Sequence, residues 1–338
     1  MSHSLVLRHI TSITAGVFLV ISSSVTSPTQ AADSQPPAKP AAPAEPVEGP
    51  WENLADGSTG QTTEFEGAGG VRIPAYIRKP AGGGPFPVVV MIHGAEASRN
   101  GTYGLGRRLA SPTADFVAAG FAVYSIDFRP KDTIPARGTT TESTDPMVQD
   151  AINAVAKARS YPFVDSKRIA IMGGSRGGKL MARLTTRVDA SAGILCAPAG
   201  LDMIELAKVI RTGQRINPAL KSMVKATERK AGTNIEEIAT DPAKYHYTSP
   251  ITEAAKVRFP LLLISGRNDV SSPIGPLEAY EKKLHASGKE VETYFPDNGP
   301  HGFYYGFPHE IPETKEAAQR AVAFLRKCFA DPSAKPER

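Results

Sequence analysis

Short apolar segments alternate with longer amphipathic ones along most of the chain. The clearest apolar segment is residues 88–92, which carry only Val, Met and Ile. An uninterrupted apolar run of this length is typical of a strand buried on both faces of a sheet. Upstream, residues 62–65 and 71–77 alternate in polarity around a glycine-rich turn, which predicts an antiparallel hairpin. The remaining predicted strands are residues 121–126, 168–172, 192–195, 261–264 and 291–295.

Amphipathic stretches between these segments predict helices. They are residues 113–119, 146–159, 177–187, 276–287 and 313–329. Asp145 stands where it can cap the second of them, because a carboxylate accepts hydrogen bonds from first-turn amides. Strands that alternate with helices predict an α/β fold, with a mostly parallel central sheet flanked by helices on both faces.

Residues 201–256 interrupt this alternation. They contain helix-like patterns but no convincing strand, and they lie between two predicted strands. Ligands of such sheets bind at the carboxyl ends of the strands, so we expect this segment to form a helical cap over a site. The alternative is a helical excursion on the surface that covers no site.

The first 32 residues differ in composition from the rest. Arg8 is their only formally charged residue, residues 13–21 are mostly apolar, and small residues follow up to Ala31 and Ala32. This order is typical of a secretory signal peptide. The apolar stretch is shorter than the ~20 residues of a membrane-spanning helix. We expect a periplasmic or secreted protein with no membrane segment in its mature form; the alternative is a buried N-terminal helix.

The rest of the chain is predicted to be one catalytic domain with short flanking segments. Residues 33–50 are mostly Ala, Pro and Glu and predict an extended linker. The α/β domain is expected over residues 51–332, with a tail at 333–338. Cys196 and Cys328 are predicted at opposite edges of the sheet, so we expect no disulfide between them.

Composition narrows the possible functions. Hydrophobic residues make up 41% of the chain and charged residues 22%, which is typical of a globular protein. The net charge of +5 is spread along the chain without a basic run, so we expect no nucleic-acid partner. His, Cys, Asp and Glu show no zinc-type spacing, so we expect no metal and no other cofactor. The oligomeric state is left open.

A candidate nucleophile follows the strand predicted at residues 168–172. Gly173-Gly174-Ser175-Arg176-Gly177 matches Gly-x-Ser-x-Gly, the nucleophile elbow. The elbow holds a serine on a tight strand-to-helix turn, and its glycines let strand and helix approach closely. The pattern alone occurs by chance, and the alternative is a glycine-rich loop. The flanking strand and helix patterns favour the elbow.

Candidates for the acid and the base follow in the order that such enzymes use. Asp269 comes directly after the strand predicted at residues 261–264, and His301 lies in a loop after the last predicted strand. A serine hydroxyl needs a base to take its proton, and the order Ser…Asp…His fits. Asp297 is the competing acid, but it stands close in sequence to His301. The alternatives are a turn-forming aspartate and a surface histidine.

Donors for a developing oxyanion are predicted at two places. The backbone N–H of Arg176 directly follows the nucleophile, where it would face the oxyanion. The second donor should come from the loop His93-Gly94-Ala95-Glu96, with Ala95 favoured over Glu96.

Together these markers resemble the α/β-hydrolase superfamily, and within it the prolyl-oligopeptidase-like and dienelactone-hydrolase-like group. The resemblance covers about residues 65–329, and it implies Ser175, Asp269 and His301 as the triad. It rests on His93-Gly94, Asp127-Phe128-Arg129, the elbow, Ser249-Pro250-Ile251, Gly266-Arg267-Asn268-Asp269 and His301-Gly302-Phe303.

The departures from these families concern the substrate. The chain has no room for the propeller of prolyl oligopeptidases, and it has serine where dienelactone hydrolases have cysteine. Ser175-Arg176-Gly177-Gly178-Lys179 also resembles glucuronoyl esterases, which carry cysteine at the position of Gly174. We expect an ester hydrolase acting on a small-molecule or carbohydrate ester. The alternatives are a serine peptidase acting on small peptides and a non-catalytic binding protein that keeps the fold.

Overall fold

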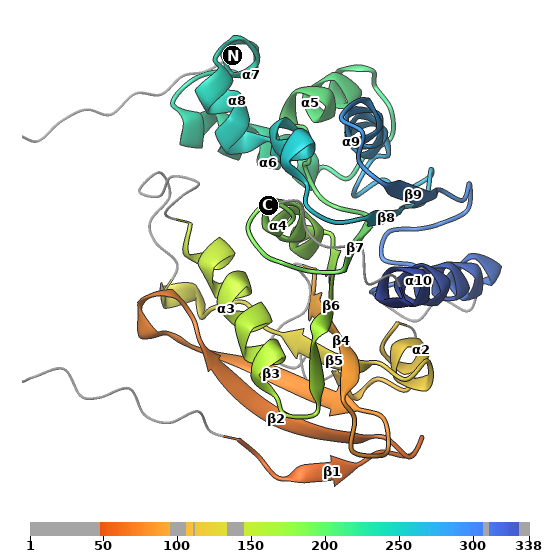
Figure 1. Ribbon diagram of the computed structural model, residues 1–338. Coiled ribbons are helices and arrows are strands. Elements are labelled where there is room, and N and C mark those ends of the chain that lie inside the picture. Colours follow the sequence, from red (N-terminus) through yellow and green to blue (C-terminus); the bar gives the residue numbers. More distant parts are fainter. Residues whose placement is uncertain (1–47, 95–105, 111, 134–144, 307–310, 331–338) are drawn as a thin grey trace, which may run out of the picture. The chain divides into compact units, whose positions relative to one another are not determined.

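A nine-stranded sheet forms the centre of the described part of the chain. The computed structural model describes residues 48–94, 106–110, 112–133, 145–306 and 311–330 (Figure 1). Within them the strand order is β1-β2-β3-β5-β4-β6-β7-β8-β9. The strands are β1 Trp51–Asn53, β2 Thr59–Glu66, β3 Arg72–Lys79, β4 Phe86–Ile92, β5 Ala122–Ile126, β6 Val164–Gly174, β7 Ala192–Cys196, β8 Leu261–Ile264 and β9 Val291–Tyr294.

The sheet combines an antiparallel edge with a parallel remainder. β1 pairs with β2, β2 with β3 and β3 with β5, all antiparallel. From β5 through β4, β6, β7 and β8 to β9 every pairing is parallel. The carboxyl ends of these parallel strands therefore meet along one edge, which is where ligands of such sheets bind. The predicted fold class, a mostly parallel sheet flanked by helices, is confirmed.

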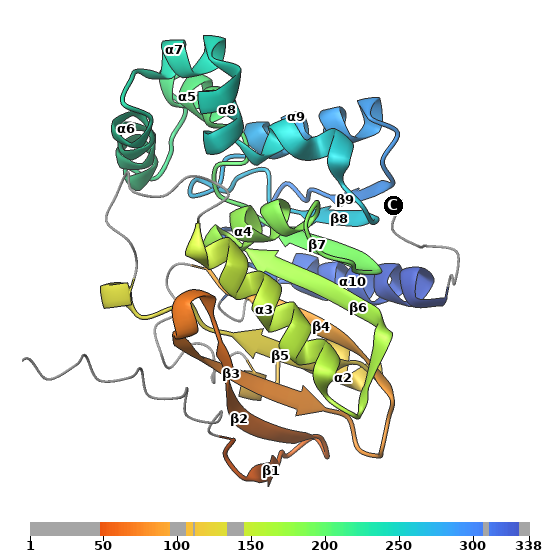
Figure 2. The same ribbon diagram turned by 60° about the vertical axis from the view of Figure 1, so that its left-hand side comes forward.

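Helices cover both faces of the sheet. On one face, α3 (Pro146–Ser160), α4 (Arg176–Leu184) and α9 (Gly275–Ala286) pack their apolar sides onto strand residues such as Val88 and Ile171. On the other, α2 (Thr113–Ala118) and α10 (Pro312–Ala330) pack against residues such as Val89 and Ile194. Figure 2 shows α3 and α10 on opposite sides of the sheet. Neighbouring strand residues alternate between the two cores, so strands buried on both faces are apolar throughout.

Residues 201–256, which we call the helical insertion, lie between β7 and β8. They form α5 (Met203–Arg211), α6 (Ala219–Ala231), α7 (Ile235–Thr240), α8 (Pro242–Thr248) and the 3-10 helix η4 (Pro250–Lys256). Asp202 and Asn234 cap α5 and α7 with their side chains. The insertion has a small apolar core of its own, centred on Met203, Leu206 and Ile238.

The structure corrects two predicted boundaries and adds one strand. Helix α4 ends at Leu184, not at residue 187, because the hydroxyl of Thr185 bonds to the Ala182 carbonyl and Arg187 Nη1 bonds to the Arg183 carbonyl. These side chains thus satisfy carbonyls that a longer helix would use. Strand β6 begins at Val164 rather than at residue 168, and the short edge strand β1 was not predicted.

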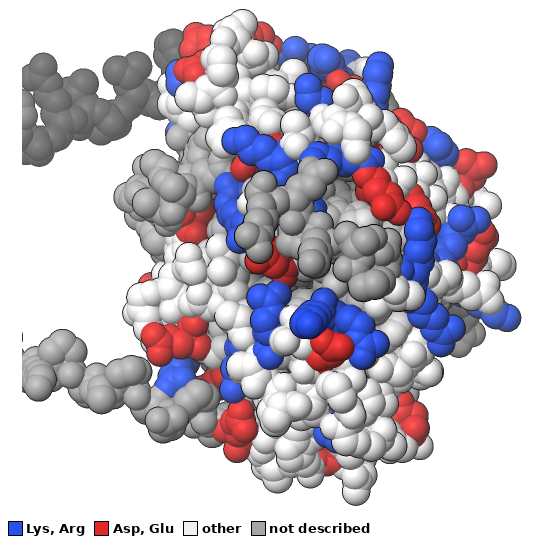
Figure 3. Space-filling view, viewed as in Figure 1, with Lys and Arg blue, Asp and Glu red and all other residues white. Residues whose placement is uncertain are grey.

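On the face of Figure 3, Lys and Arg side chains are interspersed with Asp and Glu. In the described residues, oppositely charged side chains form ion pairs such as Arg320–Glu316. No disulfide joins Cys196 and Cys328. Among the helices described, none has the length and apolar character needed to cross a membrane.

Candidate active site

Ser175 stands on a sharp turn between β6 and α4. Its φ of 50° and ψ of −113° lie outside the regions that L-residues prefer, a conformation that costs on the order of 1–3 kcal/mol. The neighbouring glycines are needed for space. A Cβ on Gly173 would lie 2.4 Å from the Gly177 carbonyl oxygen, and one on Gly177 would lie 2.3 Å from that of Ile92. The segment therefore has the geometry that an elbow requires.

Three backbone hydrogen bonds hold Ser175 on this turn. Its N–H donates to the Cys196 carbonyl at 2.9 Å, and its own carbonyl accepts from Lys179 N at 3.1 Å and Ala199 N at 3.0 Å. The Ser175 residue is only 7% exposed. Burial raises the pKa of the Cys196 thiol, so this cysteine stays protonated beside the turn. The hydroxyl of Ser175 thus remains the candidate nucleophile of this turn.

Asp269 and His301 form a hydrogen-bonded pair. His301 Nδ1 lies 2.7 Å from Asp269 Oδ2, and the Asp269 side chain is fully buried. The other carboxylate oxygen, Oδ1, accepts from the backbone N–H groups of Ser271 at 2.7 Å and Ser272 at 2.8 Å. These bonds fix the carboxylate, which in turn orients the imidazole. Asp297 is 89% exposed at its side chain and lies 3.8 Å from Arg267, so it does not replace Asp269 in the pair.

Close backbone contact brings the loops of Asp269 and His301 together. A Cβ on Gly266 would lie 1.6 Å from the Gly299 carbonyl oxygen, so the two loops touch at these glycines. Arg267 N also donates to the Pro296 carbonyl at 2.9 Å. Both loops follow neighbouring parallel strands, β8 and β9, at the edge where β6 ends in the elbow.

Ser175 is not hydrogen bonded to His301 in the described structure. The Nε2 atom of His301 instead lies 3.1 Å from the hydroxyl of Tyr305. Because a carboxylate only accepts hydrogen bonds, Nδ1 carries the proton toward Asp269, and Nε2 of the neutral ring is the acceptor. The structure thus brings Asp269, His301 and Tyr305 into one chain of hydrogen bonds.

Of the two predicted oxyanion donors, Arg176 lies within the described residues and Ala95 does not. Arg176 is the first residue of α4, so its N–H is one of the helix amides without a partner in its own helix. Ala95, like the alternative Glu96, lies outside the described residues. The Arg176 guanidinium lies 4.4 Å from the centre of the Phe128 ring, and its Nη2 is 3.3 Å from Met147 Sδ. No described carboxylate forms an ion pair with it.

A cavity of about 180 Å³ lies beside Arg176, at the start of α4. Its wall combines cationic, apolar and hydroxyl-bearing side chains. Arg176 and Lys179 come from α4, whereas Thr227 and Thr248 come from the helical insertion. The insertion therefore contributes to a space beside Arg176, the residue after the candidate nucleophile, although Ser175 itself is not in the wall.

Basic residues of α4 and of the turn that follows it fasten the helical insertion to the elbow helix. Lys179 Nζ donates to the Thr248 carbonyl at 3.2 Å. Arg183 and Arg187 each donate to Glu253 Oε2 at 3.0 Å. Burial acts to raise the pKa of Glu253, but the hydrogen bonds from Arg187 and Arg183 outweigh it and lower the pKa below its usual value.

Among the described residues, the other histidines do not join this site. Both ring nitrogens of His93 lie near oxygens, at 2.9 Å from Asp127 Oδ1 and 2.5 Å from the Gly94 carbonyl. His246 Nδ1 lies 2.9 Å from Thr252 Oγ1 within the insertion. His285 lies on α9, 3.9 Å from Glu281, and His309 is outside the described residues.

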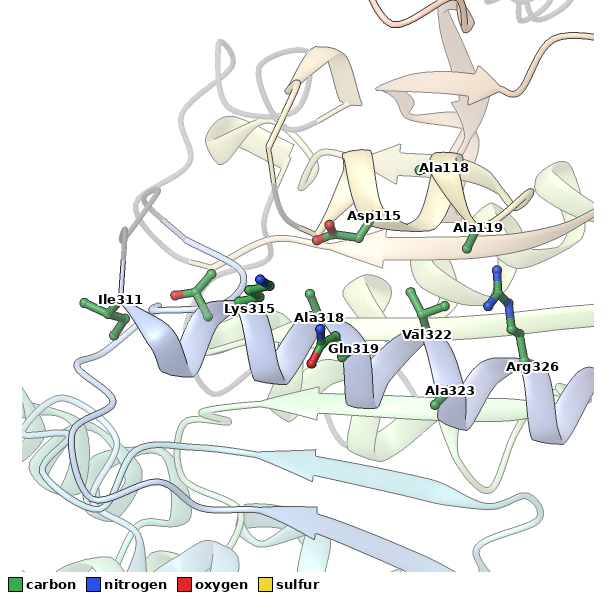
Figure 4. A pocket seen from close by; sticks show the side chains of 11 residues that line it. Asp115, Ala118, Ala119, Ile311, Lys315, Ala318, Gln319, Val322, Ala323 and Arg326 are labelled. Atoms are coloured by element: carbon green, nitrogen blue, oxygen red, sulfur yellow. The ribbon is translucent and has the colours of Figure 1, made fainter.

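A larger cavity of about 660 Å³ lies elsewhere, between α2 and α10 (Figure 4). Its lining includes Asp115 and Ala118 from α2 and Ala318, Val322 and Arg326 from α10. None of the candidate catalytic residues lies in this lining. The candidate site is therefore identified by the strained Ser175 and the hydrogen-bonded pair of Asp269 and His301, and not by cavity volume.

Two residues near the site were not predicted. Tyr305 stands four residues after His301, and Asn217 of the insertion donates from its backbone N–H to the Val270 carbonyl at 2.7 Å. The signal for Tyr305 was the pair of glycines, Gly302 and Gly306, that bracket a turn after the histidine. Asn217 offered no comparable signal.

Comparison with known proteins identifies the class. A sheet of this order with a nucleophile elbow defines an α/β-hydrolase, and the fold resembles acetyl xylan esterase from Paenibacillus sp. R4 with a TM-score of 0.62. That match is 18% identical and covers 83% of this chain and 88% of the other. A dienelactone hydrolase structure from Klebsiella pneumoniae matches with a TM-score of 0.54, at 16% identity, over 80% of this chain and 99% of the other.

The family is shown by sequence. The BD-FAE family model matches residues 76–284, which is more than half of the chain, so the chain belongs to the BD-FAE family. Dipeptidyl aminopeptidase BIII of Pseudoxanthomonas mexicana is 29% identical over 257 residues, 72% of this chain but 34% of that protein. Esterase EstD of Thermotoga maritima is 25% identical over 238 residues, 64% of this chain and 54% of EstD. By sequence the chain belongs with these esterase- and peptidase-like proteins, and the predicted resemblance is confirmed.

Proposed function

We propose that the chain is an exported carboxylic ester hydrolase in which Ser175 is the nucleophile, His301 the base and Asp269 the acid. One observation carries the proposal. Ser175 sits on a strained turn at the sheet edge from which the hydrogen-bonded pair of His301 and Asp269 also projects. Nucleophile, base and orienting carboxylate are the three parts that serine catalysis needs.

In acylation, the serine oxygen would attack the substrate while its proton moves to the histidine. Ser175 Oγ attacks the ester carbonyl carbon while its proton passes to His301 Nε2, and the carbonyl electron pair moves to the oxygen. The oxyanion accepts from the Arg176 N–H, and we propose Ala95 N as the second donor. Asp269 stabilises the imidazolium. Collapse of the intermediate breaks the bond to the alcohol oxygen, which takes the proton from Nε2 and leaves.

Deacylation would repeat these steps with water. His301 Nε2 takes a proton from water as the water oxygen attacks the acyl carbon. The second intermediate collapses, Ser175 Oγ leaves and recovers its proton from Nε2, and the acid product departs. No step requires a group beyond the residues named.

The cavity beside Arg176 supports a polar substrate. Two guanidinium groups and an ammonium in its wall outnumber the one carboxylate, Asp145, and favour acidic or hydroxyl-rich groups. Phe128 and Met147 supply apolar surface. The name of EstD describes an esterase, and that of the acetyl xylan esterase an enzyme of carbohydrate esters. We therefore propose a small-molecule or carbohydrate ester, with residues 201–256 acting as the cap over it.

A peptidase acting on small peptides is the second candidate. It is favoured by the relationship to dipeptidyl aminopeptidase BIII. An ester is the easier substrate, because a peptidase must also protonate a poor amine leaving group. A panel of acyl esters, sugar esters, acidic esters and short peptides separates these functions, and we expect esters to be turned over fastest.

A fluorophosphonate probe tests the proposed nucleophile. The probe should modify wild-type protein at Ser175 alone, as read by peptide mass spectrometry. Ser175→Ala should stay folded, lose labelling and lose on the order of 10⁴–10⁶-fold in kcat, because triad members act as a unit. Labelling of another serine in the folded protein would contradict the assignment.

A further inference from the structure

Tyr305 contacts both halves of the proposed site. Its hydroxyl is 3.1 Å from His301 Nε2, and the two rings are perpendicular with centroids 6.0 Å apart. Its ring also packs on the elbow, because a Cβ on Gly174 would lie 2.1 Å from Tyr305 Cδ2. The residue is 8% exposed, so this placement is built into the packing. Gly174 therefore leaves room for the tyrosine ring beside the nucleophile.

A tight turn returns Tyr305 to the histidine. Gly302 has a φ of 76°, a left-handed conformation that glycine adopts at little cost. Gly306 N donates to the Gly302 carbonyl at 2.8 Å and closes the turn. Arg108 Nη1 donates to the Gly306 carbonyl and ties down its far end. The position of the hydroxyl is thus set by backbone geometry on both sides.

The direction of the hydrogen bond between Tyr305 and His301 determines which lone pair of the imidazole is occupied. Asp269 fixes the proton of the neutral ring on Nδ1, so the tyrosine hydroxyl donates to the lone pair of Nε2. That lone pair is the one that must receive the proton of Ser175. We propose that Tyr305 is a positioning residue that competes with Ser175 for His301 Nε2 and holds the base off the nucleophile until acylation begins.

This inference rests on the proposed function and adds a step before it. The Oη–H···Nε2 bond must break before an Oγ–H···Nε2 bond can form at the same lone pair. Only the fraction of molecules with Nε2 released is competent, so the competition lowers the acylation rate for every substrate by the same factor.

Tyr305→Phe removes the hydroxyl and keeps the ring that packs on Gly174. The second-order rate of labelling by a fluorophosphonate and the kcat/KM for a panel of neutral esters should both rise about 5-fold, the factor expected for loss of one neutral hydrogen bond. The increase should be the same for each ester, because no substrate contact is changed.

Tyr304→Phe is the matched control. Its hydroxyl is buried and has no hydrogen-bond partner among the described residues, and its ring packs in the core beneath α10. The same chemical change one residue away should leave labelling and kcat/KM unchanged. If Tyr305→Phe does not fold, as judged by its Tm, Tyr305→Leu also lacks the hydroxyl and should show the same increase.

The outcomes separate this inference from the proposed function. Equal or slower labelling of the Tyr305→Phe protein at Ser175 would overturn the competition, and a uniform fall in kcat/KM would mean that the hydroxyl supports the base. Wild-type protein that is never labelled at Ser175 would overturn the proposed function itself, whatever the tyrosine variants do.

Discussion

Two residues at the carboxyl ends of neighbouring strands carry unfavourable backbone angles. Among non-glycine residues of the described chain, Ser175 and Ala197 have positive φ, 50° and 40°. They follow β6 and β7 and are linked through Cys196, whose carbonyl accepts from Ser175 N. Strain of this kind persists only where surrounding bonds over-determine it, and it gathers at functional sites. Its location therefore supports the edge of β6 and β7 as the reactive region.

Asp269→Asn should abolish most of the activity without unfolding the protein. The amide can no longer stabilise an imidazolium, and it favours the wrong tautomer of His301, so kcat should fall by roughly 10³–10⁴-fold. Asp297→Asn is the control, because Asp297 is exposed and contacts only Arg267 among the described residues. Steady-state kinetics on one ester checks both variants. A larger loss in the Asp297 variant would show that the acid was wrongly assigned.

Local sequence was enough to predict part of the site but not all of it. Ser175 has a five-residue motif, and Asp269 and His301 each follow a predicted strand in a known order. The pairing of Asp269 with His301 follows from neighbouring parallel strands that share one edge. Tyr305 is marked only by the glycines around its turn, and these do not reveal its contact with Gly174, because the two residues are distant in the chain. Spacing alone does not give a three-dimensional contact of that kind.

At the scale of elements, α4 connects the nucleophile with the helical insertion. Its first residue follows Ser175, and Lys179 and Arg183 lie one turn apart on it, with Arg187 in the turn just after its end. All three bond to residues 246–253, the root of the insertion. A shift of this root would therefore pull on the helix that presents Ser175. The fastening favours a fixed wall beside the nucleophile over a lid that swings freely.

Glu253→Gln should weaken this fastening in a pH-dependent way. The lowered pKa means that the native state favours the carboxylate, so its stabilisation is fully present above the unfolded value of 4.5 and is lost as pH falls through the native pKa. At pH 7 the variant should lose about 3 kcal/mol of unfolding free energy, because two arginines lose their buried partner.

Urea unfolding at pH 7 and at more acidic pH measures this effect. The difference between wild type and Glu253→Gln should shrink as the pH falls below 4.5, because the wild-type carboxylate is then protonated as well. Glu316→Gln, at an exposed pair with Arg320, is the matched control and should change stability little at any pH. A constant gap between wild type and Glu253→Gln down to the most acidic pH would contradict this account.

Element boundaries were less predictable than the elements themselves. Strands such as β4 are apolar because both faces are buried, and that pattern is visible in the sequence. The end of α4 depends on the side chains of Thr185 and Arg187, which donate hydrogen bonds to carbonyls near the end of the helix. β1 has three residues and only one neighbour, β2, so it carries too few apolar positions to mark a strand.

Considered as a whole, the chain matches relatives of very different length. This chain covers 34% of the dipeptidyl aminopeptidase and 88% of the acetyl xylan esterase that it matches. A shared fold does not by itself determine function, which depends on the residues of the site. In this chain residues 201–256 contribute Thr227 and Thr248 to the cavity beside the elbow, which makes the insertion the place to alter substrate choice.

The predicted signal peptide can be tested by expressing the full sequence. If residues 1–32 are a signal peptide, protein expressed with its full sequence in a bacterium should be recovered outside the cytoplasm. Its mature N-terminus should lie near Ala32 or Asp33, as determined by Edman sequencing or intact mass. Leu19→Arg places a charge in the apolar stretch and should leave an unprocessed protein in the cytoplasm. The matched control is Ser34→Arg, which lies past the cleavage region and should be exported and processed like the wild type. Met1 retained on the active protein, or equal export of the Leu19→Arg variant, would show that this segment is not a signal peptide.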